Sequence, residues 1–238
     1  MSKSTSNEID SVTFVAYPKL FFVWPLIVAG YLFYFIGSGM EEGGTGLEVL
    51  GWTYITVIGF VLLTLGIDVT RNQAIVWAVL ILALWVGGLY LQDVQGLPLL
   101  SDIYGWLAGL DAAYDPGFGL ALSIVMTVPF LVMLGHSYLD DRWRITHNEF
   151  EHYSFGRMKD SLGRGAKTIR TEFPDVFELL LGMSGTLIVF NATGTKELRR
   201  IPHIMFLPFV RTRLNRILER TAITAALSEA EEDDDDDV

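Results

Sequence analysis

Four stretches of the sequence carry no charged residue, and each is long enough to cross a lipid bilayer as a helix. A helix needs roughly 20 mostly apolar residues to span the hydrocarbon core, and its backbone groups must be hydrogen-bonded within the segment. The sequence therefore predicts a four-helix transmembrane domain over residues 19–139. The four uncharged stretches are Leu20–Met40, Val49–Ile67, Asn72–Gln92 and Pro116–Leu139.

The distribution of basic residues predicts the orientation of these helices. Of the 17 lysine and arginine residues, Arg71 alone lies between Leu20 and Asp141, in the turn between the second and third helices. The other two loops carry only acidic charges, and the positive-inside rule places such loops outside. We therefore expect a multi-pass protein of the inner (cytoplasmic) membrane with both termini cytoplasmic. The acidic loop residues are Glu41, Glu42, Glu48, Asp93, Asp102, Asp111 and Asp115.

Three further segments differ in composition from the helices. Residues 1–18 are polar at their start and read as a flexible cytoplasmic leader. Residues 97–110 are apolar on one side and too short to span, which predicts a helix in the outer interface or a docking surface for a partner or quinone-like ligand. Residues 222–238 contain eight acidic residues and predict a disordered tail. This tail either solubilises the chain, folds back on the basic domain or captures a basic partner.

After the fourth helix the pattern becomes that of a soluble domain over residues 140–221. Alternating and β-branched runs predict short strands, with a short helix or a buried strand pair over 173–181. An amphipathic helix over about 208–220 closes the domain, with an apolar stripe of Phe206, Val210, Leu214 and Ile217. The strands are expected at 143–146, 150–155, 167–171, 186–190 and 197–201.

Two short motifs in this domain resemble the bacterial membrane-anchored PH-like domains. One is Trp143-Arg144-Ile145-Thr146-His147-Asn148-Glu149, directly after a transmembrane helix, and the other is the Ile201-Pro202-His203 bend before the last helix. The resemblance covers about a third of the chain, and the four membrane helices differ from the two typical of that family. It implies a bacterial protein, a PH-like barrel with a closing C-terminal helix, and a protein- or lipid-facing adaptor.

The residue types that carry catalysis do not occur here in the required patterns. With no cysteine, disulfides and thiolate metal sites are excluded. The four histidines lack zinc spacing, and His136 has no histidine in another membrane helix with which to hold a haem. No phosphate loop, dinucleotide glycine pattern, nucleophile elbow or HExxH motif occurs. We therefore predict no enzymatic activity, no catalytic or metal site and no cofactor.

The formal net charge of −11 hides a basic cluster within the soluble domain. Between Asp140 and Arg220 the chain has 14 basic and ten acidic residues, and five of the basic residues follow the second predicted strand. Near an anionic leaflet each such charge contributes about 1 kcal/mol of attraction. The cluster indicates either anionic-lipid or partner binding, or an ordinary positive-inside surface. Its members are Arg157, Lys159, Arg164, Lys167 and Arg170.

These observations predict an all-α membrane bundle of four helices joined to a cytoplasmic α+β PH-like barrel. The function that fits is a non-enzymatic inner-membrane scaffold or accessory subunit, whose barrel mediates protein or anionic-lipid contacts. We expect membrane lipids and a protein partner or a homo-oligomer as its contacts, and no nucleic acid. The alternative is a small membrane transporter or a lipid-active membrane enzyme that uses a cavity between the helices.

Overall fold

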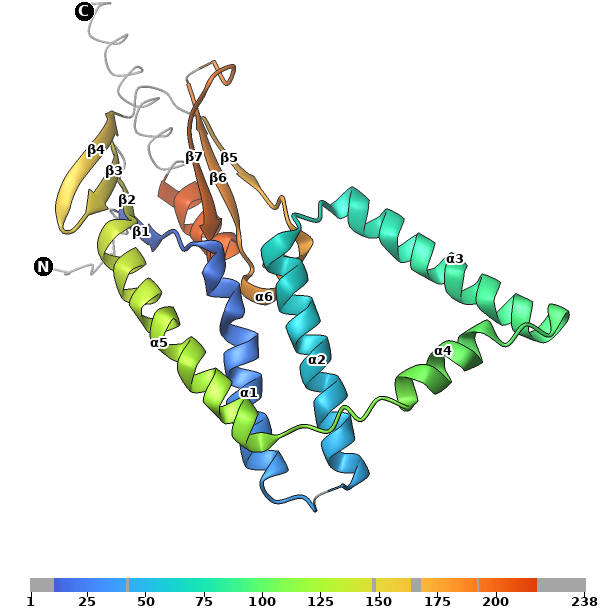
Figure 1. Cartoon of the computed structure of the whole chain (residues 1–238). Coiled ribbons are helices and arrows are strands. Elements are labelled where there is room, and N and C mark those ends of the chain that lie inside the picture. The colour runs from blue at the N-terminus through green and yellow to red at the C-terminus, as the bar shows by residue number, and fades with distance from the viewer. Residues whose placement is uncertain (1–10, 42, 147–148, 164–167, 192, 218–238) are drawn as a thin grey trace, which may run out of the picture. The chain divides into compact units, whose positions relative to one another are not determined.

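The structure, a computed structural model, describes residues 11–41, 43–146, 149–163, 168–191 and 193–217. The chain divides into two compact units, and the helical unit consists of Leu20–Leu131 with Pro174–Phe177. The α+β unit consists of the described residues of Met1–Lys19, Val132–Phe173 and Glu178–Val238. Figure 1 labels the helices α1–α6 and the strands β1–β7.

Four helices are long and apolar enough to cross a membrane, as the sequence predicts. These candidate spans are Lys19–Gly37, Thr45–Gly66, Arg71–Gln95 and Pro116–Asp140. The membrane type and the orientation remain predictions. The elements of this part are η1 (Lys19–Val23), α1 (Trp24–Gly37), α2 (Thr45–Gly66), α3 (Arg71–Gln95), α4 (Leu99–Ala108) and α5 (Pro116–Asp140).

Close approach between helical segments occurs where glycine leaves room. A Cβ at Gly30 of α1 would collide with the Ser123 hydroxyl of α5, and one at Gly51 of α2 would collide with the carbonyl oxygen of Ala112. Beside these glycines, Tyr114 donates its hydroxyl to the Gly30 carbonyl at 3.2 Å. Its ring lies edge-on to Tyr54 at 5.2 Å. Glycine therefore lets α1, α2 and the first turns of α5 pack around a tyrosine-rich core.

Helix α3 does not pack with the other three spans into the bundle that the sequence predicted, because none of its residues is buried. Its side chains are apolar all round, so no face is marked for packing, as suits a helix that lipid surrounds. Thr70 begins it with a capping box, in which the Thr70 hydroxyl and the Gln73 side chain each bond the other's backbone N–H. Helix α4 lies within the predicted 97–110 segment, and its place in the membrane interface stays a prediction.

The α+β unit contains two antiparallel sheets, of order β1-β2-β3-β4 and β5-β6-β7. Strand β1 lies in the segment that we predicted as a flexible leader, and there the sequence alternates buried and exposed residues in register with β2. Of the two alternatives predicted for residues 173–181, the structure has the short helix, α6, and not the strand pair. The elements are β1 (Ser11–Val15), β2 (Arg142–Thr146), β3 (Glu149–Ser154), β4 (Arg157–Gly163), β5 (Thr168–Glu172), α6 (Val176–Gly182), β6 (Gly185–Phe190) and β7 (Glu197–Ile204).

One hydrophobic core joins the two sheets to a helix over residues 207–217. An isolated bridge from Ala16 to Ile204 links the sheets, but the predicted barrel is not closed. The apolar stripe of the last helix begins at Leu207, which is fully buried, and not at Phe206, which is 56% exposed. Phe206 has a φ of +52° in the turn before the helix, and this conformation turns it away from the stripe.

The order of elements places the helical unit inside the α+β unit along the chain. Strand β1 precedes α1, and β2 follows α5 with only Asp141 between them. Five residue pairs nevertheless join β1 to β2, from Ser11 opposite Thr146 to Val15 opposite Arg142. Both ends of the helical insertion therefore meet in one sheet (Figure 1).

Candidate anion-binding pocket

Strand β2 places two arginines on one face of its sheet and two core residues on the other. Successive side chains of a strand point to opposite faces. Trp143 and Ile145 are accordingly buried in the core, with exposed fractions of 5% and 1%. Arg142 and Arg144 are exposed on the opposite face. Packing of the core residues thus fixes the direction of the arginines.

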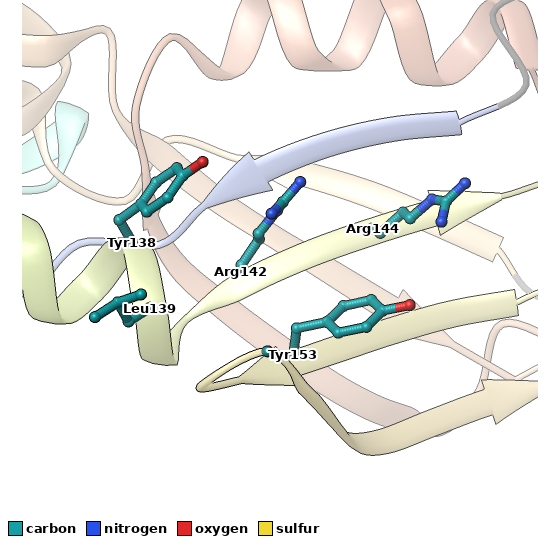
Figure 2. Close-up of a pocket in the computed structure, with 6 residues that line it drawn as sticks. Tyr138, Leu139, Arg142, Arg144 and Tyr153 are labelled. Atoms are coloured by element: carbon teal, nitrogen blue, oxygen red, sulfur yellow. The ribbon is translucent and has the colours of Figure 1, made fainter.

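The two arginines line a pocket of about 320 Å³ at the end of α5. Tyr138 and Leu139 contribute the last turn of that helix, and Tyr153 contributes the neighbouring strand β3. Figure 2 shows Arg142, Arg144 and Tyr153 on the same side of the sheet, with Tyr138 beside the first of them. Gly156, in the β3–β4 turn, completes the lining with a φ of +73°, a conformation that glycine adopts without strain.

Neither arginine of the pocket has an ion pair within the part of the chain that the structure describes. The Arg142 guanidinium lies 5.8 Å from the centroid of the Tyr138 ring, a cation–π contact that orients the group while leaving its N–H donors available. By contrast, Arg200 of β7 donates to Glu197 at 2.9 Å. The donors of both β2 arginines are therefore open to an added anion.

Two carboxylates close to this pocket, Glu151 and Asp140, have hydrogen-bond donors of their own. Glu151 stands opposite Arg144 in the β2–β3 register and accepts a hydrogen bond from the Tyr153 hydroxyl at 2.9 Å. Asp140 accepts a hydrogen bond from the Ser154 hydroxyl. Glu151 still places a negative charge near the pocket, so any anion bound there competes with it for Arg144.

The structure describes three of the five residues in the basic cluster predicted from the sequence, and these three lie on two different sheets. Arg157 and Lys159 are exposed on β4. Arg170 belongs to the other sheet, where its guanidinium lies 5.0 Å from the Phe190 ring. Arg164 and Lys167 lie outside the described residues. The prediction relied on proximity in sequence, whereas the alternation of Arg142-Trp143-Arg144-Ile145 directly after a span was the signal for a paired-arginine face.

Two histidines of the α+β unit have structural partners, His152 on β3 and His203 on β7. The His152 ring stacks on Trp143 at 4.2 Å and an angle of 11°, and its Nε2 lies 3.2 Å from the Asp141 carboxylate. His203 pairs with Glu178 at 3.2 Å. A cavity of about 530 Å³ lies alongside, and the Nδ1 of His152 and the Nε1 of Trp143 are buried without a partner in the described chain.

Comparisons of the chain with protein-family models, with curated proteins and with solved structures found no match.

Proposed function

We propose that this chain is a non-enzymatic membrane scaffold or accessory subunit, whose α+β unit contacts anionic lipid or a protein at the membrane surface. The observation that carries the proposal is the pairing of β1 with β2 across the whole helical insertion. Because the strands adjoin the first and last candidate spans, both ends of the insertion belong on one side of a membrane. An even number of spans satisfies that condition, and the described residues contain four candidates.

We also propose that the α+β unit is a PH-like domain, and the strand order supports this. A four-stranded and a three-stranded antiparallel sheet, followed by a helix at 207–217, is the order expected of a PH-like domain. In this reading the helical unit is an insertion between the first two strands. With the positive-inside pattern, the α+β unit would face the cytoplasm of a bacterial cell.

The charge on the unit supports contact with anionic lipid. Arg142 and Arg144 follow the last turn of α5, a candidate span, and have no acidic partner in the described chain. If α5 crosses the bilayer, this turn lies at the depth of the headgroups, where basic residues are attracted to anionic lipid. Exposed Tyr138 in that turn fits the aromatic belt of an interface.

Helix α3 supports the scaffold class over a closed transport unit. Its candidate span has no buried residue, whereas 39% of the window at Lys19–Gly37 is buried. The side chains of α3 are thus available to lipid, to a partner helix or to a second copy of the chain. Two of its exposed residues are Trp77 and Trp85, which are large enough to anchor such a contact.

The test is purification of the full chain from its native membranes in a mild detergent, followed by mass determination and identification of the co-eluting components. A stoichiometric protein partner or a closed homo-oligomer supports the scaffold. A lone monomer that retains a small molecule overturns it in favour of transport or lipid chemistry. Deletion of residues 143–238 serves as a second arm, because a scaffold loses its cellular phenotype with the α+β unit while a transporter retains flux.

A further inference from the structure

The geometry of the β2 arginines goes beyond general attraction to an anionic surface. Residues two apart on a strand are separated by about 6.6 Å along it, so the guanidinium groups of Arg142 and Arg144 can reach one group from two sides. Arginine donors in a planar fork match the oxygens of phosphate and form charge-assisted hydrogen bonds with them. A diffuse basic surface attracts anions without two arginines that reach the same group.

The walls of the pocket define the size and position of the ligand. Its volume of about 320 Å³ is at the lower end of the range for small-molecule sites, which suits a headgroup and not an extended polymer. Tyr138 and Leu139 lie in the last turn of the candidate span of α5, so a phosphate at this depth can belong to a lipid whose chains lie along that helix.

We propose that the pocket binds one phosphate group of an anionic phospholipid, with Arg142 and Arg144 donating to its oxygens and Tyr138 holding the Arg142 guanidinium in place. This inference rests on the membrane placement in the proposed function. Glu151, opposite Arg144, weakens the site by competing for that arginine. Removing the Glu151 charge is therefore expected to strengthen phosphate binding.

The experiment uses the full chain in detergent, stripped of lipid and titrated with phosphatidylglycerol under native mass spectrometry. The double variant Arg142→Gln/Arg144→Gln is expected to bind the first lipid at least about tenfold more weakly, since two charge-assisted bonds are lost. The control is Arg213→Gln/Arg216→Gln, which removes the same charge from exposed positions on the last helix. The control is expected to bind like the unaltered chain.

A competition arm identifies the source of the phosphate. If phosphatidic acid displaces phosphatidylglycerol and inorganic phosphate does not, the site binds a lipid headgroup. Displacement by inorganic phosphate as well assigns it to the phosphate group alone, and the arginines keep their role. Binding by Glu151→Gln is expected to be tighter than that of the unaltered chain, with thermal unfolding unchanged.

Equal loss in both double variants, or no loss in either, overturns the proposed site. Looser binding by Glu151→Gln does so as well. These outcomes leave the scaffold proposal standing, because the partner or oligomer in the native purification is determined separately. Since Arg142 and Arg144 are exposed, their variants are expected to fold, and the unfolding midpoint of each variant verifies this.

Discussion

Phe14 and Trp143 face each other in the antiparallel β1–β2 pair, although all the candidate membrane helices lie between them in the chain. Both side chains are buried in the core that also contains the last helix. The contact therefore joins the segment before α1 to the segment after α5. Stability of the α+β unit depends on a strand that is remote from the rest of it in sequence.

Replacing Phe14 with alanine is expected to destabilise the α+β unit by about 3–5 kcal/mol, the usual cost of deleting a buried phenylalanine. Thr13→Ala on the same strand is the control, because Thr13 is exposed opposite Arg144. Denaturant unfolding followed by tryptophan emission measures both. Equal stability of the two variants would show that β1 does not contribute to the core.

Single cysteines in this cysteine-free chain test the orientation. Ser101→Cys in α4 is expected to react with a membrane-impermeant maleimide on intact cells, because its loop is acidic and predicted to lie outside. Met158→Cys on β4, at a residue 52% exposed, is expected to react only after permeabilisation. The unaltered chain is the blank, and the reverse labelling pattern would invert the predicted topology.

Gly51→Ala is expected to destabilise the helical unit by about 1–3 kcal/mol, the range for overpacking. The added methyl would collide with the Ala112 carbonyl, which is backbone and cannot rotate away. Gly59→Ala on the same helix is the matched control, since a Cβ there meets nothing within 4 Å. The midpoint of thermal unfolding in detergent should fall for the first and not for the second.

The helical unit is expected to lose stability at alkaline pH because the buried Tyr114 hydroxyl titrates there. Burial, and then the neighbouring Tyr54 and Asp115, raise the pKa of Tyr114 from 10.0 to about 12. A raised pKa means that the folded state favours the neutral hydroxyl. The stability that Tyr114 contributes is therefore complete below pH 10 and is lost as the pH rises through 12. Unfolding midpoints are therefore expected to fall between pH 10 and 12.

In Tyr114→Phe this fall should become shallower, because the titrating hydroxyl is gone. At neutral pH the variant loses about 1 kcal/mol with the hydrogen bond to the Gly30 carbonyl. Tyr104→Phe, at a residue 74% exposed on α4, should behave like the unaltered chain at every pH. An unchanged slope in Tyr114→Phe would show that another group causes the alkaline loss.

The helices and most strands could be predicted because each has a local signal. Uncharged runs mark the four candidate spans, and the continuous run of apolar and β-branched residues at Thr186–Phe190 marks β6, whose bounds are Gly185–Phe190. Strand β1 was missed because its partner lies beyond α5, and a single short run carries no sign of such a distant pairing. Helix α3 was placed in a bundle because a uniformly apolar helix looks the same from its sequence whether lipid or protein surrounds it.

The candidate site was harder to predict than the fold. Clustering by sequence selected five basic residues, and the three that the structure describes, Arg157, Lys159 and Arg170, lie on two different sheets. Arg142 and Arg144 became a candidate only when strand β2 directed them to one face and the end of α5 supplied a wall. Convergence of side chains depends on which elements pack together, and that information is not local.

The insertion of the helices between β1 and β2 also determines the order of events during synthesis. Strand β1 leaves the ribosome first, yet its partner is made only after α5 is complete. Until then the apolar side chains of Val12 and Phe14, buried in the finished core, have no sheet to cover them, and long-range strand pairing is slow. The α+β unit can therefore be completed only after the whole helical segment has been synthesised.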